Sequence, residues 1–263
     1  MRRNLGPVTA TGLAAGFAFL YLPILTLAVY SFNDGRLVSV WSGWSLRWYR
    51  ALIDNKMMLD AAWMTLKAGV VSATLALVIG TLAALVLARA GRFLGRSAFA
   101  GLVYVPLVMP EIVLGLCLLL MFVQLDVDRG FVTLVLGHAS FSAAFVAVVV
   151  HSRLVTVDRS IEEAAMDLGA TPATTFFRIT VPMIAPALVA GWMLAFTLSL
   201  DDLVIASFVT GPGATTLPMR VYSQVRLGVT PEINAISTIF IAAVALIVAA
   251  ASLVNKGLFQ ART

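Results

Sequence analysis

Acidic side chains inside apolar segments are the residues of this chain best suited to chemistry. Glu111 follows Pro110 in an apolar run, and Asp201 and Asp202 are flanked by leucine and valine. A charged residue at the centre of a membrane span costs roughly 2.5 to 3.5 kcal/mol, so these acids should face protein or a watery path. Because opposite charges attract, acids without a basic residue nearby in their spans favour a cationic cargo. The alternative is that they pair with Arg or Lys of a partner subunit.

Aromatic rings near these acids could complete a site for an amine. Tyr104, Trp192 and Phe196 could each offer a ring face to a cation, with core packing as the alternative role for each. Adjacent helical residues project about 100° apart. We therefore expect only one of Asp201 and Asp202 to face the pathway, while the other packs or forms hydrogen bonds.

Other catalytic constellations are incomplete in this sequence. His138 and Ser140 lack a Gly-flanked nucleophile motif and a third group, which argues against a hydrolase. His138 and His151 have no matching carboxylate or thiol ligands, and the single cysteine, Cys117, cannot form a disulfide or a thiolate cluster within one chain. No ATP-binding motif is present. The sequence therefore predicts a protein that is not an enzyme and that binds no metal or cofactor itself.

The composition indicates which elements must position these residues. About 60% of the residues are hydrophobic and 12% are charged, far below the roughly 25% charged residues of soluble domains. Recurrent apolar runs near 20 residues long predict an all-α integral membrane protein, with residues 1–263 forming one domain. Six transmembrane helices are expected at residues 11–32, 62–88, 97–123, 130–151, 186–209 and 233–254. The prolines beside Glu111 predict a kinked or broken third span.

The distribution of charge sets the expected orientation. The connection between the second and third spans carries Arg89, Arg92 and Arg96, whereas the next connection contains Asp126 and Asp128. The positive-inside rule then places the basic loop and both termini in the cytoplasm. The net charge of +5 is explained by topology and by contact with lipid headgroups, so no nucleic-acid partner is predicted.

The first outer loop is rich in aromatic residues that suit a membrane interface. Their amphipathic rings would lie at headgroup level, and the alternative role is a docking surface for an external partner. These residues are Trp41, Trp44, Trp48, Tyr49 and Trp63.

The long inner loop, about residues 152–185, carries ordered helix signals. Ser160 and Glu163 form a capping box that predicts a helix start, and Gly169 is placed to end this helix. Thr171 followed by Pro172 predicts a second short helix, limited by Pro182 and Pro186. The result would be a helix-turn-helix on the inner membrane surface.

The first of these helices has features of a docking element. Ala164 and Ala165 leave a small-residue face that allows close approach of a partner backbone, and Glu163 offers a carboxylate to a partner Arg or N–H group.

The run Glu163, Ala164, Ala165, then Gly169, and then Ile179 to Pro182 resembles the coupling motif in the membrane subunits of bacterial ABC importers. Residues 160–172 and 191–219 resemble the polyamine branch of that family. The resemblance implies a type I ABC importer permease fold whose cytoplasmic coupling helix inserts into a groove of the ATPase subunit. It assigns this contact to Glu163, Ala164, Ala165, Gly169, Ile179 and Pro182.

The resemblance also implies partners and a location in the bacterial inner membrane. A second homologous permease, two ATPase subunits that hold ATP and Mg, and a periplasmic polyamine-binding protein would complete the transporter. The expected function is the import of a polyamine, with putrescine favoured. Spermidine remains open, because the periplasmic protein would set most of the selectivity.

A secondary carrier is the alternative function. In it, Glu111 with Asp201 or Asp202 would bind protons or sodium and so couple transport of a small cationic solute to an ion gradient. Such carriers normally contain paired repeats with matching broken helices, and the sequence shows no convincing internal repeat.

Overall fold

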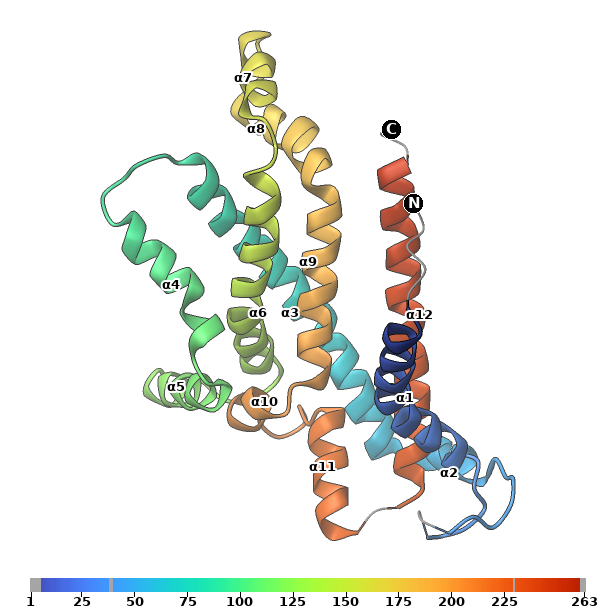
Figure 1. Cartoon of the computed structure of the whole chain (residues 1–263). Coiled ribbons are helices and arrows are strands. Elements are labelled where there is room, and N and C mark those ends of the chain that lie inside the picture. The colour runs from blue at the N-terminus through green and yellow to red at the C-terminus, as the bar shows by residue number, and fades with distance from the viewer. Residues whose placement is uncertain (1–5, 38–39, 229, 261–263) are drawn as a thin grey trace. The chain divides into compact units, whose positions relative to one another are not determined.

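The computed structural model describes residues 6–37, 40–228 and 230–260, with side chains described up to residue 250 except at residues 7 and 227. Within these ranges the secondary structure is helical, and one isolated bridge joins Asn33 to Trp44. Figure 1 shows the ribbon. The elements in chain order are α1 (Pro7–Tyr30), α2 (Arg47–Asp54), α3 (Lys56–Arg89), α4 (Arg96–Val108), α5 (Glu111–Gln124), α6 (Phe131–Leu154), α7 (Arg159–Asp167), α8 (Pro172–Thr175), the π-helix η1 (Phe176–Thr180), α9 (Val181–Asp201), α10 (Val204–Val209), α11 (Leu217–Leu227) and α12 (Glu232–Gln260).

Five helical stretches of the described chain are long and apolar enough to cross a membrane. A sixth span is obtained if the bent pair α4 and α5 is counted as one. The prediction of an all-α membrane protein is therefore confirmed. The five stretches are Val8–Tyr30, Lys56–Arg89, Phe131–Leu154, Pro172–Asp201 and Glu232–Ala250.

The predicted third span is broken, as its prolines indicate. α4 ends at Val108, α5 begins at Glu111, and the two axes differ by 114°. Met109 has an extended backbone and Pro110 occupies the N-cap position of α5. Proline disfavours helical geometry in the residue before it and lacks an N–H group, so the chain turns at this point.

The predicted fifth span, 186–209, is wrong at both ends. Helical backbone begins already at Pro172 and passes through η1 into α9, so no short helix ends at Pro182 or Pro186. Pro182 lies in the first turn of α9, directly after η1, and Pro186 is accommodated within the helix. The far end breaks at Asp202, whose backbone is extended, before α10 begins at Val204.

The chain divides into two compact units. One unit comprises residues 1–60 and 221–245, and the other comprises residues 61–220 and 246–263. In the first, the loop after α1 is organised by the buried side chain of Asn33, which donates to the Val40 carbonyl and accepts from the Ser42 N–H group. The indole of Trp48 donates to the Asn33 carbonyl at 2.9 Å, which ties α2 to the loop.

The second unit is built on closely packed spans. α6 runs beside α9, and α10 packs against α5 and α6 (Figure 1). A Cβ atom at Gly80 of α3 would lie 2.8 Å from Val146 Cβ of α6, and one at Gly115 of α5 would lie 2.6 Å from the ring of Phe208. Small residues allow helix backbones to approach where lipid provides no hydrophobic driving force for association. The contact at Gly115 brings together α5 and α10, the two helices that follow the breaks.

Candidate functional site

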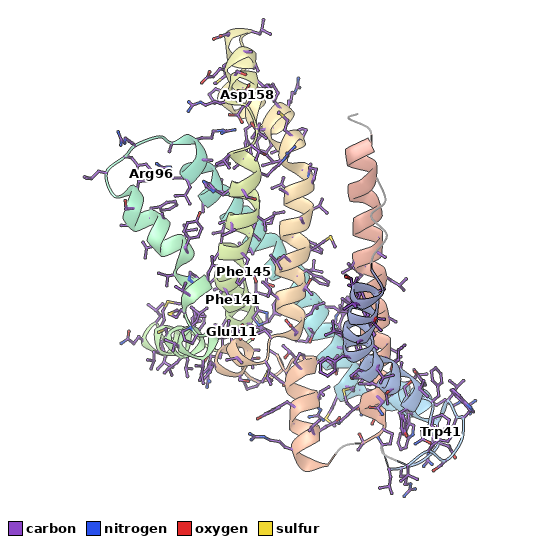
Figure 2. The ribbon with its side chains drawn as sticks, in the orientation of Figure 1. Trp41, Arg96, Glu111, Phe141, Phe145 and Asp158 are labelled. Carbon is purple, nitrogen blue, oxygen red and sulfur yellow. The ribbon has the colours of Figure 1, made fainter. Side chains whose placement is uncertain are left out.

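The two helix breaks bring the three membrane acids together. Glu111 is the first residue of α5, Asp201 is the last residue of α9, and Asp202 lies between α9 and α10. Because α5 packs against α10, the Glu111 carboxyl group lies within electrostatic range of both aspartates. Figure 2 shows Glu111 at the junction of α4 and α5. Residues about 90 positions apart in sequence thus form one acidic centre.

The two adjacent aspartates have different environments. Asp201 is exposed at the end of α9, whereas the side chain of Asp202 is 9% exposed. Asp202 accepts hydrogen bonds from the backbone N–H groups of Ile205 and Ala206, each at 3.0 Å, and so caps the start of α10. One of its oxygens lies 2.8 Å from Nε2 of His138, on α6. Asp202 is thus the aspartate that forms hydrogen bonds, and the expectation that the other one faces a pathway stays a prediction.

His138 connects Asp202 to two serines, a contact that the sequence did not predict. Its Nδ1 lies 2.6 Å from Ser199 Oγ on α9, and Ser72 Oγ on α3 lies 3.1 Å from the same Ser199 oxygen. Ser140, the serine considered from sequence, instead donates to the Leu136 carbonyl on an exposed face. A polar residue in the middle of an apolar helix was the available signal, since such residues are rarely left unpartnered.

The Ser199, His138 and Asp202 set resembles a hydrolytic triad in composition only. Ser199 is 3% exposed and His138 is 2% exposed, so no substrate carbonyl could reach the hydroxyl group. Ser199 and His138 are therefore buried, whereas Asp201 and Glu111 are exposed.

The three aromatic candidates have contacts or burial of their own. Trp192 stacks on Phe196 with ring centroids 5.1 Å apart and donates its indole N–H to Thr74 at 3.1 Å. Phe196 is 2% exposed, which fits core packing. Trp192 precedes Asp201 by nine residues, about 13 Å along a helix, and Tyr104 is half-buried on α4.

The structure does not group the acids into a metal site. Among the residues that the structure describes, no three His, Cys, Asp or Glu side chains gather in a group that could hold a metal ion.

A second candidate site is the loop formed by α7 and α8. The N-cap of α7 lies two residues before the cap that the capping box predicts: it is Asp158, whose carboxylate accepts from the Ser160 N–H at 2.9 Å. The Ser160 cap is therefore wrong, because Asp158 is an equally good acceptor and lies two residues upstream. This backbone hydrogen bond, with a further bond from the Ser160 side chain, lowers the pKa of Asp158. Figure 2 shows Asp158 at the start of the loop.

Both other helix signals in this loop are confirmed. Gly169 has a φ of +91°, and the N–H group of Ala170 donates to the Ala165 carbonyl, which is the pattern of a glycine-terminated helix. The Thr171 side chain accepts from the Thr174 N–H group, and Pro172 is the first residue of α8. The two signals predicted correctly where one helix ends and the next begins.

The adjacent acids of α7 also divide between a buried and an exposed environment. Glu162 is buried and forms an ion pair with Arg89 of α3, at 3.0 Å, and it accepts from the Thr180 hydroxyl at 2.9 Å. Glu163, the acid of the sequence motif, is exposed and pairs with Arg159 one turn earlier on the same helix. From the sequence, Arg89 was used only to predict the membrane topology, so its contact with Glu162 was not predicted.

The outward face of the loop is apolar as well as small. Ala164 and Gly169 are exposed, while Ala165, Ile179 and Pro182 are half-buried. Large apolar side chains that the motif did not include surround them, namely Ile161 (44% exposed), Met166 (41%), Leu168 (90%) and Phe177 (67%). Exposed apolar groups of this kind mark interaction surfaces.

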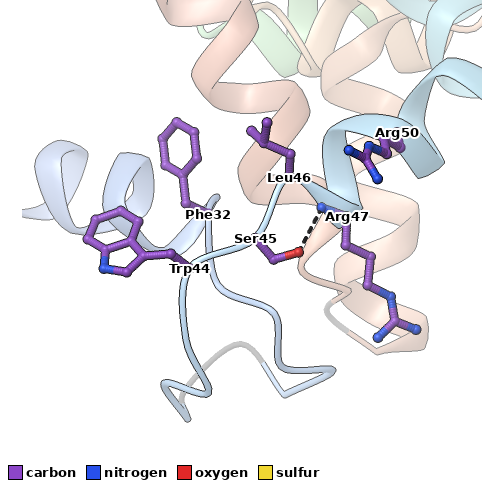
Figure 3. A pocket seen from close by; sticks show the side chains of 6 residues that line it. All are labelled: Phe32, Trp44, Ser45, Leu46, Arg47 and Arg50. Carbon is purple, nitrogen blue, oxygen red and sulfur yellow. Dashed lines mark hydrogen bonds between the residues drawn. The ribbon is translucent and has the colours of Figure 1, made fainter.

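A surface pocket of about 480 Å³ lies in the first unit. Phe32, Trp44, Leu46, Arg47 and Arg50 line it together with Ser45, whose hydroxyl accepts from the Arg47 N–H group (Figure 3). The aromatic residues of the first loop thus combine edge-to-face ring contacts, as between Trp41 and Trp44, with nearby basic side chains. This composition suits an interface with lipid headgroups or with a protein partner.

The family of the chain follows from comparison with known proteins. Residues 76–262 match the family described as binding-protein-dependent transport system inner membrane component. The chain belongs to this family, and the resemblance to ABC importer permeases is confirmed. It is therefore a multi-pass protein of the inner membrane.

Particular relatives narrow the comparison further. The chain is 56% identical over 241 residues to the putrescine transport system permease protein PotI of Escherichia coli strain K12, covering 89% of this chain and 86% of that protein. It is 42% identical over 244 residues to the spermidine/putrescine transport system permease protein PotC of the same strain, covering 93% and 92%.

Solved structures support the fold alone. A chain of a bacterial ABC transporter that imports the acidic polysaccharide alginate matches with a TM-score of 0.76 at 18% identity, covering 93% of this chain and 94% of that one. A chain of the MetNI methionine ABC transporter matches with a TM-score of 0.64 at 20% identity, covering 76% and 95%.

Proposed function

We propose that this chain is a permease subunit of an ATP-driven importer that moves a polyamine, with putrescine as the favoured cargo. The observation that carries the proposal is the convergence of Glu111, Asp201 and Asp202 at two helix breaks that pack together. The 56% identity to PotI supports putrescine over other cations. Because Asp202 is already occupied by His138 and the α10 cap, Glu111 and Asp201 are the acids that contact the cargo.

The acidic centre suits a diamine for electrostatic reasons. Two exposed carboxylates can compensate the charge of a cation that leaves water, whereas an anion would be repelled. Breaks in membrane helices also free backbone carbonyl groups that can accept from ammonium groups. Trp192 and Tyr104 remain candidates for more distant contacts along the pathway, and Phe196 contributes packing beneath Trp192.

In the proposed transporter, α7 is the cytoplasmic coupling helix. Its exposed apolar side chains, with Glu163, Ala164, Ala165 and Gly169, form the contact with the ATPase subunit. Glu162 joins α7 to the end of α3 through Arg89 and to η1, just before α9, through Thr180. A displacement of α7 by the closing ATPase dimer is therefore transmitted to two membrane helices as a rigid-body movement.

The proposal includes the rest of the assembly. A second homologous permease completes the pathway, two ATPase subunits bind ATP and Mg, and a periplasmic protein delivers the polyamine. Both termini and the α7 loop then face the cytoplasm, as the basic residues of the connection between α3 and α4 indicate.

Uptake by the reconstituted complex tests the proposal. Labelled putrescine, spermidine and an uncharged solute are offered to proteoliposomes with and without ATP, binding protein and ATPase subunits. We expect uptake of the polyamines only when all components are present. The two broken spans, α4 with α5 and α9 with α10, are a feature shared with secondary carriers. Uptake by this chain alone, driven by an ion gradient, would therefore overturn the proposal in favour of that alternative.

A further inference from the structure

A chain of buried polar groups links three membrane helices to the break between α9 and α10. It consists of Ser72 on α3, Ser199 on α9, His138 on α6 and Asp202 at the break. Relative exposures are 0% for Ser72, 3% for Ser199 and 2% for His138. Buried polar groups are expensive unless they are partnered, so this arrangement requires an explanation beyond filling space.

The buried groups form a continuous series of contacts. Ser72 Oγ lies 3.1 Å from Ser199 Oγ and 3.3 Å from the Gly69 carbonyl oxygen, and Ser199 Oγ lies 2.6 Å from Nδ1 of His138. On the other side of the ring, Nε2 lies 2.8 Å from Asp202 Oδ2, which brings the imidazole into close electrostatic contact with the carboxylate. The carboxylate, which can only accept, also receives the Ile205 and Ala206 N–H groups. The close contact with His138 and the two backbone hydrogen bonds therefore hold Asp202 in one orientation.

The orientation of Asp202 decides the shape of the break. Its carboxylate satisfies two N–H groups that the first turn of α10 leaves without helical partners. With Asp202 turned inward, the preceding residue, Asp201, remains exposed at the end of α9. Asp201 also lies within electrostatic range of His138 and Asp202, so the position of the latter pair affects the cation site directly.

We propose that His138 is a positioning residue for the cargo site. By holding Asp202 it fixes the break between α9 and α10 and thereby directs Asp201 toward the pathway. The expected effect of His138 on transport rests on the function proposed above. Its effect on the capping of α10 does not, because the capping can be measured in the assembled complex without any transport.

Two amide substitutions separate this role from simple packing. The side-chain nitrogen of Gln lies near the position of Nε2, so His138→Gln retains a donor facing Asp202. The amide of Asn ends near the position of Nδ1, so His138→Asn retains only a partner for Ser199. His138→Leu retains the volume and removes both contacts. Each variant is assembled into the full complex, and the KM for labelled putrescine and the hydrogen exchange of the Ile205 and Ala206 amides are measured.

We expect His138→Asn and His138→Leu to raise the KM about tenfold, equivalent to one contact of roughly 1.4 kcal/mol, and to accelerate exchange at both amides. His138→Gln should stay within about twofold of the wild type in KM, because it retains a donor facing Asp202. Equal effects of Gln and Asn would overturn the proposal, as would unchanged amide exchange in His138→Asn. If His138→Leu fails to assemble, the Gln and Asn pair still decides the question. A wild-type complex that transports no polyamine refutes the proposed function, whereas the amide exchange result still tests the role of His138.

Discussion

Two regions of this molecule each contain a pair of adjacent acids, and the pairs are built alike. In α7, Glu162 is buried against Arg89 while Glu163 is exposed. At the end of α9, Asp202 is held by His138 while Asp201 is exposed. In both pairs, one carboxylate is held by contacts with distant residues, and its neighbour is exposed.

The difference between the pairs lies in the basic group and in its surroundings. Arg89 carries a permanent charge and retains 19% side-chain exposure, so its ion pair is a stable joint between helices. His138 retains 1%, and its two ring nitrogens contact different partners, Asp202 on one side and Ser199 on the other. The loop pair is therefore suited to transmit a displacement, and the membrane pair is suited to fix the direction of a single hydrogen-bonded group.

The largest effect is expected from removing the joint at the loop. Arg89→Ala leaves the buried Glu162 without its cation. Breaking a fully buried ion pair lowers the free energy of unfolding by about 3 to 5 kcal/mol. Because these side chains are 19% and 11% exposed, we expect the free energy of unfolding to fall by about 2 kcal/mol. ATP-driven uptake should fall more than tenfold, as measured in proteoliposomes, and thermal stability should decrease. Arg92→Ala, an exposed substitution in the same basic connection, is the matched control. Similar losses in both variants would assign the effect to loop charge rather than to the ion pair.

The next largest effect concerns the outward face of α7. Gly169→Asp places a carboxylate at the negative end of the helix dipole, which costs about 0.3 to 1 kcal/mol, and introduces a charge beside exposed Leu168. We expect uptake to be abolished while the amount of protein in the membrane, measured by immunoblot, stays normal. Gly169→Asn has nearly the same size and tolerates the positive φ of 91°, so it should retain most activity. Near-normal uptake by the Asp variant would count against a docking role for this face.

A smaller effect is expected from neutralising the membrane acids. Asp201→Asn should raise the KM for putrescine about tenfold through the loss of one charge contact, without changing hydrogen exchange at Ile205 and Ala206. Asp202→Asn should accelerate exchange at these two amides, because the neutral group accepts from them less strongly. Glu111→Gln should resemble Asp201→Asn. If all three amides transport putrescine with normal KM, the acids have a structural role only.

The smallest effect concerns the cap of α7 and its pH dependence. The hydrogen bond from the Ser160 N–H group lowers the pKa of Asp158, so the cap stabilises α7 above the unfolded value near 3.8 and is lost only as the pH falls below it. Exchange of the first α7 amides, corrected for intrinsic rates, should therefore be unchanged between pH 7 and pH 5. Asp158→Ala should accelerate this exchange at both pH values, whereas Asp158→Asn should not. If the protection of these amides against hydrogen exchange declined between pH 7 and pH 5, another group would have to cap the helix.

Much of the architecture could be predicted from local sequence. Apolar runs predicted the membrane helices, Pro110 predicted the broken third span, and Gly169 predicted the end of α7, because each signal acts within a few residues. The break at Asp202 and the continuous helix from Pro172 to Asp201 were missed. Proline and aspartate can each either begin a helix or interrupt one, depending on their position in it. The packing of the neighbouring spans decides which of these effects occurs.

The sequence by itself determined that this chain is a membrane protein with acids in its spans and a capped loop carrying the family motif, since hydrophobicity, charge and turn chemistry are properties of short segments. Only the tertiary structure decided which acid of each adjacent pair is buried. Arg89 and His138 lie 73 and 64 residues from their partners. Side chains that distant meet only when packed helices bring them together, and the low polarity of the packed interior then makes that partnership obligatory.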